Sequence, residues 1–325
     1  MSLVEVILTL STFIGGLALL YYGAEFLVKG GSKIALMLKV SPLVVGLTIV
    51  SLGTSAPELF VSLVAAFNKE SHIALGNALG SNIANVGLVL GISAILAPIT
   101  CSIRAVRYQI PVLFLTTLLF MILAMDGVLT WWNGIILLLG LVVFIIFSVR
   151  LSQEETVADL PELEDLKEDT SGEGKKPLRF YLGLLLIGTI LLSVGAHLLV
   201  ESSIEIAGLL DIDTRIVALA IIALGTSLPE LAATLMAAHR NESDLGLGNI
   251  VGSNIFNLLG ILGLACMVNN IQVNEQFVWD IFIMIGFFLF MLPVVVWDGK
   301  ITRTEGIVLF FFYVVYIILL VMKVI

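Results

Sequence analysis

Long apolar runs separated by short polar connections dominate this chain. A helix that crosses a bilayer needs about 20 mostly apolar residues, and ten runs of the sequence reach that length. They lie at about 3–28, 41–67, 73–98, 106–125, 130–150, 180–208, 213–238, 245–269, 277–297 and 304–324. The pattern predicts an all-α membrane protein with ten transmembrane helices.

Composition supports this fold class and excludes several others. Of the 325 residues, 59% are hydrophobic and only 13% are charged, whereas about 25% are charged in an ordinary soluble domain. So little charge could not cover the surface of a soluble protein, and it argues against a disordered chain and a nucleic-acid binder. The expected partners are the lipid bilayer and inorganic ions, and the chain is expected to act as a monomer.

The long polar connection at 152–179 divides the chain into two units. It holds nine acidic and four basic residues, and it lacks aliphatic periodicity, which is typical of a solvated linker. We therefore expect a first five-helix unit at 1–151, an acidic linker at 152–179 and a second five-helix unit at 180–325.

The two units repeat each other with an offset of 172 residues. The segment 53–66 reads GTSAPELFVSLVAA and shares nine of 14 residues with 225–238. The segment 76–91 reads GNALGSNIANVGLVLG and shares nine of 16 residues with 248–263. Because five helices are an odd number of crossings, the second unit begins on the opposite side of the membrane. The sequence thus predicts two inverted-topology five-helix repeats, as in many secondary transporters.

The distribution of Lys and Arg orients this arrangement in the membrane. Thirteen of the 16 fall on one side, and only Lys69, Arg215 and Lys323 fall on the other. Positive charge marks the cytoplasmic side, so the linker 152–179 is expected inside and both termini outside. The expected location is the plasma membrane or bacterial inner membrane.

Two carboxylates, Glu58 and Glu230, lie in apolar runs at equivalent positions of the repeats. No other apolar run offers a Lys or Arg at comparable depth, and an ionisable residue inside a membrane is costly and marks function by default. Pro57 and Pro229 interrupt both helices, because proline lacks an N–H and clashes with the carbonyl four residues earlier. The freed carbonyls and the two carboxylates could supply about six oxygens, which suits Ca²⁺.

Neutral polar residues accompany the carboxylates in both repeats. They recur every four residues as Asn77, Ser81 and Asn85, and again as Asn249, Ser253 and Asn257. Such a stripe must face protein, water or an ion, so hydrogen bonding between helices is the alternative to ion binding. Asn82 and Asn254 lie one position off the stripe, and we interpret them as structural.

The paired motifs G-T-S-x-P-E and G-N-x-x-G-S-N-I-x-N resemble the α-repeats of the cation/Ca²⁺ antiporter superfamily, and in particular those of prokaryotic sodium/calcium exchangers. The resemblance implies that Glu58 and Glu230 bind both Ca²⁺ and Na⁺, and that Thr54 and Thr226 offer backbone carbonyls to Ca²⁺. It implies that Na⁺ is also bound by Ser51, Ser55, Ser81, Ala223, Ser227 and Ser253. The middle of the site would be completed by Asn85 and Asn257. Some relatives carry aspartate at the position of Asn257.

These features together predict a secondary active antiporter that exchanges Na⁺ for Ca²⁺ by alternating access, without a cofactor. The resemblance also implies that helices 1 and 6 slide over the other helices. Exchange of H⁺ for Ca²⁺, or exchange that depends on K⁺, is an alternative. A passive cation channel is another, although a channel would conduct without a counter-ion. An enzyme is not expected, because no H-E-x-x-H motif is present.

Overall fold

The computed structural model describes residues 3–102, 105–153, 176–209 and 225–322, and these residues are almost entirely helical. The helices of the first half are α1 (Leu3–Leu38), α2 (Pro42–Val45), η1 (Gly46–Val50), α3 (Ser51–Thr54), α4 (Ala56–Phe67), α5 (Ser71–Ala84), η2 (Asn85–Leu90), α6 (Gly91–Leu96), η3 (Ala105–Gln109), α7 (Ile110–Ala124) and α8 (Trp131–Gln153). Those of the second half are α10 (Leu178–Leu209), α13 (Leu228–His239), α14 (Ser243–Phe256), η6 (Asn257–Ile261), α15 (Leu262–Val268), α16 (Glu275–Asp298) and α17 (Arg303–Val321). The η segments are π-helical.

The described helices account for most of the predicted membrane spans. Seven of them are long and apolar enough to cross a membrane, and an eighth span results if the bent pair 42–54 and 56–67 is counted as one. The predicted run 277–297 falls within α16. Of the predicted run 213–238, residues up to 224 lie outside the described residues, and α13 forms the remainder. The prediction of an all-α membrane protein is confirmed.

Helix α1 is longer than the sequence suggested. The predicted run ended at residue 28, but the helix continues to Leu38. Ile34 and Ala35 are completely buried, so packing against other helices holds this last part in place beyond the apolar run. The helix ends where Lys39 adopts a positive φ of 55°. At about 1.5 Å per residue, 36 residues extend well beyond the apolar thickness of a bilayer.

Two short strand pairs join the halves of the chain. Strand β1 (Ile99–Thr100) pairs with β4 (Lys300–Ile301), and β2 (Val128–Leu129) pairs with β3 (Ile271–Gln272). Adding the offset of 172 residues to β1 gives the position of β3, and adding it to β2 gives that of β4. The pair β1–β4 and the pair β2–β3 are therefore equivalent. The repeat in the sequence is therefore a pseudo-two-fold symmetry of the structure.

The turns before β2 and β4 follow the same symmetry. Gly127 and Gly299, which are equivalent residues, have positive φ angles of 80° and 60°, which glycine adopts without a steric cost.

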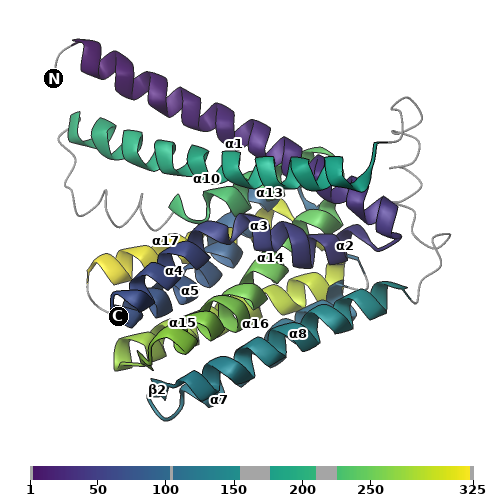
Figure 1. Ribbon diagram of the computed structural model, residues 1–325, viewed down its shortest axis with the longest axis vertical. Helices are drawn as coiled ribbons and strands as arrows, with labels where there is room; N and C mark the ends of the chain where they lie inside the picture. The colour runs from purple at the N-terminus through teal and green to yellow at the C-terminus, as the bar shows by residue number, and fades with distance from the viewer. Residues whose placement is uncertain (1–2, 103–104, 154–175, 210–224, 323–325) are drawn as a thin grey trace.

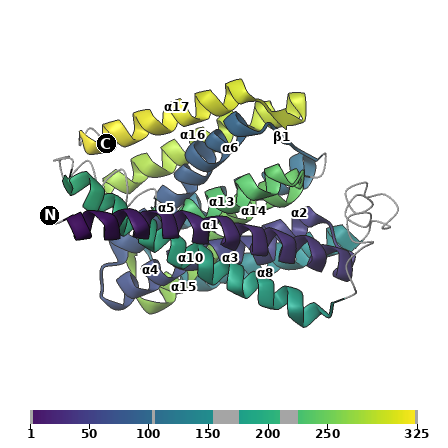
Figure 2. The same ribbon diagram turned by 90° about the horizontal axis from the view of Figure 1, so that it is seen from above.

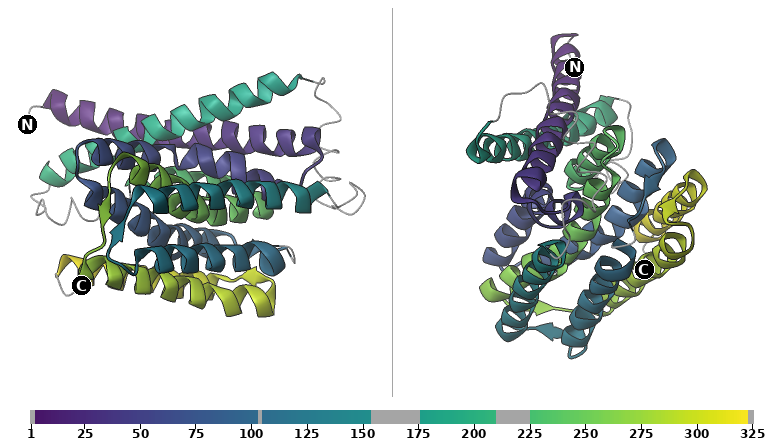
Figure 3. Two further views of the ribbon diagram at one scale, coloured as in Figure 1. Left: turned by 60° about the horizontal axis from the view of Figure 1, so that its bottom comes forward. Right: turned by 90° about the vertical axis from the view of Figure 1, so that its right-hand side faces the viewer.

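Helices α1 and α10 lie side by side along one edge of the molecule, and the views from other directions agree (Figures 1, 2 and 3). They meet through equivalent glycines. A Cβ atom added at Gly16 would lie 3.0 Å from the carbonyl oxygen of Gly195, and one added at Gly23 would lie 3.0 Å from that of Gly188. Small residues let helices in a membrane approach closely. The glycines therefore hold α1 and α10 together as one layer.

A second close approach joins the two halves near the centre. Gly252 of α14 lies against η1, and an added Cβ atom there would be 2.5 Å from the carbonyl oxygen of Leu47. Most buried apolar residues of α14 and of its continuation η6 belong to the larger of the two hydrophobic clusters in the described part of the chain; they are Leu247, Ile250, Val251, Ile255, Leu258 and Leu259. This packing places α14 directly beside the interrupted helix that carries Glu58.

Candidate cation-binding site

A helix with a proline in its first turn positions one buried carboxylate in each half. In the first half, the helix axis bends by 50° between Thr54 and Ala56, and α4 begins with Pro57 in its first turn. In the second half, α13 begins at Leu228 with Pro229 in its first turn. The predicted interruption is therefore present in the first half. In the second half a turn at Thr226 and Ser227 precedes α13, and residues 210–224 lie outside the described part of the chain.

The bends place Glu58 and Glu230 in the first turns of α4 and α13. There the positive end of the helix dipole and the unpaired N–H groups stabilise a negative charge. This explains how two carboxylates can lie in the interior of a membrane protein. Both side chains are 1% exposed, and neither forms an ion pair with a Lys or Arg among the described residues.

Hydrogen bonds across the interface join the first bend to the second half. The Ser55 hydroxyl donates to Oε1 of Glu230 at 3.0 Å. The Thr54 hydroxyl donates to Oδ1 of Asn249 at 3.0 Å and lies 3.4 Å from Oγ of Ser253. The structure thus brings residues of both repeats into one polar centre.

Several polar atoms at this centre are buried without a hydrogen-bond partner among the described residues. They are Oε2 of Glu58, Oε2 of Glu230, Oγ of Ser227, Oδ1 of Asn257, and both Oδ1 and Nδ2 of Asn85. Buried polar groups are nearly always hydrogen-bonded, and an unpaired one costs about 1–3 kcal/mol. Five of these six atoms are oxygens, so the centre offers a set of oxygen ligands that a bound cation would satisfy.

The predicted site residues fall on a few neighbouring segments. Ser51, Thr54 and Ser55 lie on α3 and at its end, Ser81 lies on α5, and Ser253 lies on α14. All five side chains are buried.

The remaining predicted residues, apart from Ala223, lie at the starts of η2 and η6 and in the turn before α13. Asn85 and Asn257 are the first residues of η2 and η6, and Thr226 and Ser227 form the turn before α13. Thr226 is half-buried, whereas its equivalent Thr54 is completely buried. Ala223 lies outside the described residues.

The polar stripe is expected to contact either ions or neighbouring helices. In the structure its first residue, Asn77, bonds to a neighbouring helix, whereas its last residues, Asn85 and Asn257, keep oxygens without a partner among the described residues. Asn77 donates through Nδ2 to the backbone oxygen of Glu58 at 3.1 Å and to Oγ of Ser62 at 2.9 Å. Asn77 therefore supports the backbone of the carboxylate residue. Asn85 and Asn257, at the other end of the stripe, keep unpaired amide oxygens.

Residue Asn82 contributes to the site in a way that the sequence did not reveal. In keeping with a structural role, Nδ2 of Asn82 donates to the backbone oxygen of Asn254 at 3.2 Å. In addition, Oδ1 of Asn82 accepts a hydrogen bond of 3.0 Å from Nδ2 of Asn257. The available signal was its repetition as Asn254 in the second motif.

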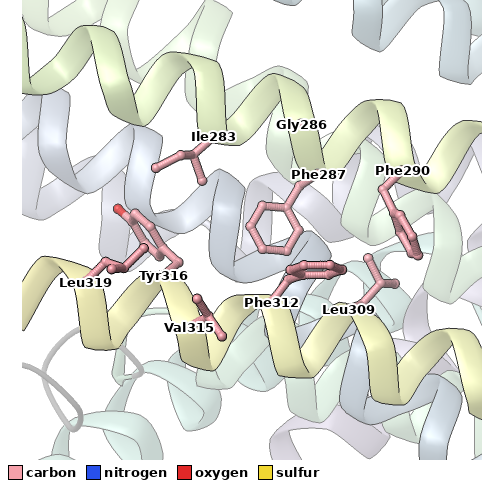
Figure 4. A pocket seen from close by; sticks show the side chains of 9 residues that line it. All are labelled: Ile283, Gly286, Phe287, Phe290, Leu309, Phe312, Val315, Tyr316 and Leu319. Carbon is pink, nitrogen blue, oxygen red and sulfur yellow. The ribbon is translucent and has the colours of Figure 1, made fainter. Parts of the chain in front are cut away.

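An apolar groove between α16 and α17 offers no alternative cation site. Figure 4 shows its lining, which is formed by Ile283, Gly286, Phe287, Phe290, Leu309, Phe312, Val315, Tyr316 and Leu319. Its polar atom is the Tyr316 hydroxyl, which donates to Oδ1 of Asp280 at 3.0 Å. Among the described residues, no group of three or more His, Cys, Asp or Glu side chains could hold a metal ion. Any cation site at the polar centre therefore combines two carboxylates with neutral oxygens.

Comparison with known proteins agrees with this arrangement. The sodium/calcium exchanger protein family matches the chain over residues 8–150 and 180–322. The chain belongs to this family. It is therefore a multi-pass membrane transporter and not an enzyme, and the family transports Na⁺ and Ca²⁺.

Individual relatives cover almost the whole chain. A candidate antiporter named CaxA, from Alkalimonas amylolytica, is 37% identical over 93% of this chain and 95% of its own length. The sodium/calcium exchanger MaX1 from Methanosarcina acetivorans is 32% identical over 94% of this chain and 96% of its own length.

A solved structure confirms the architecture. The sodium-calcium exchanger NCX_Mj, in crystals soaked with zero Na⁺ and Ca²⁺, superimposes with a TM-score of 0.81 at 33% identity, covering 97% of this chain and 99% of that chain. The match confirms the predicted fold of ten transmembrane helices in two repeats.

Proposed function

We propose that the protein exchanges Na⁺ for Ca²⁺ by alternating access, with a midplane site built on Glu58 and Glu230. The observation that carries this proposal is the pair of buried carboxylates, each at the start of a half-helix and each with an unpartnered Oε2. Two negative charges match one Ca²⁺, which prefers six to eight oxygen ligands. The name of MaX1 as a sodium/calcium exchanger supports the same pair of ions.

The ligands follow from the residues around this pair. Ca²⁺ is bound by both carboxylates and by the backbone carbonyls of Thr54 and Thr226. Na⁺ ions use the same carboxylates and, in addition, Ser51, Ser55, Ser81, Ala223, Ser227 and Ser253. Asn85 and Asn257 complete the middle of the site with their amide oxygens, which lack other partners among the described residues.

Uptake of radioactive Ca²⁺ into Na⁺-loaded vesicles tests this function. We expect uptake that depends on an outward Na⁺ gradient and stops when the external Na⁺ concentration equals the internal one. Uptake driven instead by a pH gradient would indicate H⁺ exchange, and a requirement for K⁺ would indicate a K⁺-dependent exchanger. Uptake without any counter-ion would indicate a channel. Each of these three results would contradict the proposal.

If three Na⁺ are carried for each Ca²⁺, the charge of the site makes exchange sensitive to voltage. With asparagine at both 85 and 257, the fixed charge is −2, from Glu58 and Glu230. One Ca²⁺ gives a neutral complex, whereas three Na⁺ give a charge of +1, on which the membrane potential acts with up to ~2.3 kcal/mol per 100 mV. We therefore expect an inside-negative potential to accelerate Ca²⁺ export through the Na⁺-loaded step. The rate is measured in vesicles with a K⁺/valinomycin potential.

An aspartate at position 257 provides the matched variant for this test. If the new carboxylate is ionised, Asn257→Asp moves the net charge from the Na⁺-loaded to the Ca²⁺-loaded complex, and the voltage dependence should move with it. A wild-type rate that ignores the potential under both ion conditions would contradict transport of three Na⁺ and indicate an electroneutral exchange of two Na⁺ for one Ca²⁺.

The orientation of the protein can be tested at the acidic linker, which we propose to be cytoplasmic. A cysteine introduced at Ser171 should react with a membrane-impermeant thiol reagent only after the cells are opened. The native thiols allow this experiment, because Cys101 and Cys266 are free and buried. Burial, with a smaller contribution from Asp244 and Glu305, raises the pKa of Cys101 to about 12, so this thiol stays protonated and unreactive near neutral pH. Ready labelling of Ser171→Cys in intact cells would mean that the termini are inside.

A further inference from the structure

Two equivalent hydrogen bonds between asparagines are available across the interface, and only one is formed. Asn82 corresponds to Asn254, and Asn85 corresponds to Asn257, each at an offset of 172 residues. Asn257 donates through Nδ2 to Oδ1 of Asn82 at 3.0 Å. The equivalent bond would run from Nδ2 of Asn85 to Oδ1 of Asn254. Both of these atoms are buried, and neither has a partner among the described residues.

The bends of the two interrupted helices show the same asymmetry. The Ser55 hydroxyl donates to Oε1 of Glu230 at 3.0 Å. Its equivalent would be a bond from Ser227 to Glu58, but Oγ of Ser227 and Oε2 of Glu58 lack partners in the described part of the chain. The bond that the first bend donates to the carboxylate of α13 is thus formed, whereas the equivalent bond, from the second bend to the carboxylate of α4, is not formed among the described residues.

The amide nitrogen of Asn85 cannot bind a cation, and the opposite arrangement would pair it with Oδ1 of Asn254. Inside a membrane protein no bulk water is present to satisfy a lone amide, so an unpaired donor and an unpaired acceptor at equivalent positions both favour a second arrangement. In a protein with inverted repeats, exchanging the conformations of the two halves converts a site that opens to one side into a site that opens to the other.

We propose that Asn82 and Asn254 are positioning residues that hold Asn257 and Asn85 in turn. In the conformation of this structure, Asn82 anchors the amide nitrogen of Asn257 and leaves its Oδ1 free to face a cation. In the opposite conformation, Asn254 anchors the amide nitrogen of Asn85, and the bond between Asn82 and Asn257 opens. The inference rests on the proposed function in one respect, because alternating access supplies the two conformations.

Substitution by leucine, which has nearly the same shape as asparagine but no hydrogen bonds, tests the proposal. Asn82→Leu removes the bond to Asn257 and, with it, the bonds that Nδ2 of Asn82 donates to the backbone oxygen of Asn254 at 3.2 Å and to Sδ of Met284 at 3.5 Å. It should therefore reduce the population of the present conformation at least about fivefold, the effect of one typical net hydrogen bond. Asn254→Leu removes the bond of the opposite conformation. The bond that it also removes in the present one, from Nδ2 of Asn254 to the backbone oxygen of Ile250 at 2.9 Å, lies within α14 and does not join the halves, so the population of the present conformation should increase about fivefold. The double variant should return close to the wild-type equilibrium.

Hydrogen exchange in nanodiscs without Na⁺ or Ca²⁺ reports this equilibrium. Segments 53–58 and 225–230 read GTSAPE and GTSLPE, so their unprotected exchange rates are nearly equal. The proposal has the two segments exchange environments between the two conformations, so the ratio of their protection reports the equilibrium. We expect Asn82→Leu to lower the protection of 53–58 relative to 225–230 and Asn254→Leu to raise it.

A remote asparagine provides the control. Asn133 accepts a hydrogen bond from the backbone N–H of Thr130 at 3.0 Å and donates to the backbone oxygen of Leu123 at 3.2 Å. Asn133→Leu should lower the melting temperature without changing the protection ratio. If Asn82→Leu and Asn254→Leu both lower the melting temperature and shift the ratio in the same direction or not at all, their role is structural and the proposal is wrong.

The result is separable from the proposed function. Opposite shifts of the ratio in a protein that fails to exchange Na⁺ for Ca²⁺ would overturn the choice of ions and support the positioning role. Exchange of Na⁺ for Ca²⁺ by a protein whose variants show no opposite shifts would support the choice of ions and overturn the positioning role of Asn82 and Asn254.

Discussion

Replacing either Glu58 or Glu230 with glutamine is expected to reduce Ca²⁺ exchange by at least about 100-fold. Both carboxylates are buried, so removing one leaves a divalent cation with an uncompensated charge in a medium of low dielectric constant. Breaking a buried charge interaction costs about 3–5 kcal/mol, and each 1.4 kcal/mol is tenfold. Uptake of radioactive Ca²⁺ by purified Glu58→Gln and Glu230→Gln proteins in vesicles measures the loss.

Retention of the fold distinguishes a lost ligand from a lost structure. Both variants should elute as monodisperse protein, because the amide keeps the shape of the side chain and removes a buried charge that lacks an ion-pair partner among the described residues. Glu275→Gln, at an exposed carboxylate in the first turn of α16, should transport at the wild-type rate. Normal exchange by either well-folded Glu58 or Glu230 variant would show that the cation binds elsewhere.

A side chain added at Gly252 is expected to separate the two halves where α14 packs against η1. Its Cβ atom would lie 2.5 Å from the oxygen, 2.6 Å from Cα and 2.7 Å from the carbonyl carbon of Leu47. These are backbone atoms, which cannot turn aside as the end of a side chain can. Gly252→Ala should therefore destabilise the protein by about 3 kcal/mol, the upper part of the usual range for overpacking. Gly252→Leu should prevent folded protein from accumulating.

Thermal unfolding and size-exclusion profiles in detergent measure these effects. Gly183 of α10 provides the matched control, since an added Cβ atom there meets no atom within 4 Å in the described part of the protein. Gly183→Ala should unfold at the wild-type temperature or slightly above it, because alanine favours a helix more than glycine does. Wild-type stability of Gly252→Ala would mean that η1 and α14 are farther apart than the structure shows.

The sequence predicted the helical architecture because its signals are local and large. Apolar runs mark the spans, Pro57 and Pro229 mark the bends, and an isolated acidic residue in an apolar run is rare enough to identify Glu58 and Glu230. The repeat then predicted that these two residues belong to one centre. Their ligand roles, and the exact boundaries of the two repeats and the acidic linker, stay predictions.

Other features depend on contacts that no local pattern encodes. The strands are two residues long, which is too short to show an alternation of polar and apolar positions. The π-helical turns that begin at Asn85 and Asn257 contain ordinary helix sequences. Asn82 and Asn254 are the same residue in the same motif, so the sequence could not indicate which of them forms the bond to its partner. Only the structure distinguishes Asn82, which bonds to Asn257, from Asn254, whose Oδ1 has no partner among the described residues.

The symmetry of the strand pairs and of the carboxylates also bears on the origin of the chain. Each strand pair takes one strand from each half, and each half supplies one of the two carboxylates. Neither half is therefore a complete unit of folding or of cation binding. An ancestor with a single repeat would have needed to enter the membrane in both orientations and to bind its cation as an antiparallel dimer.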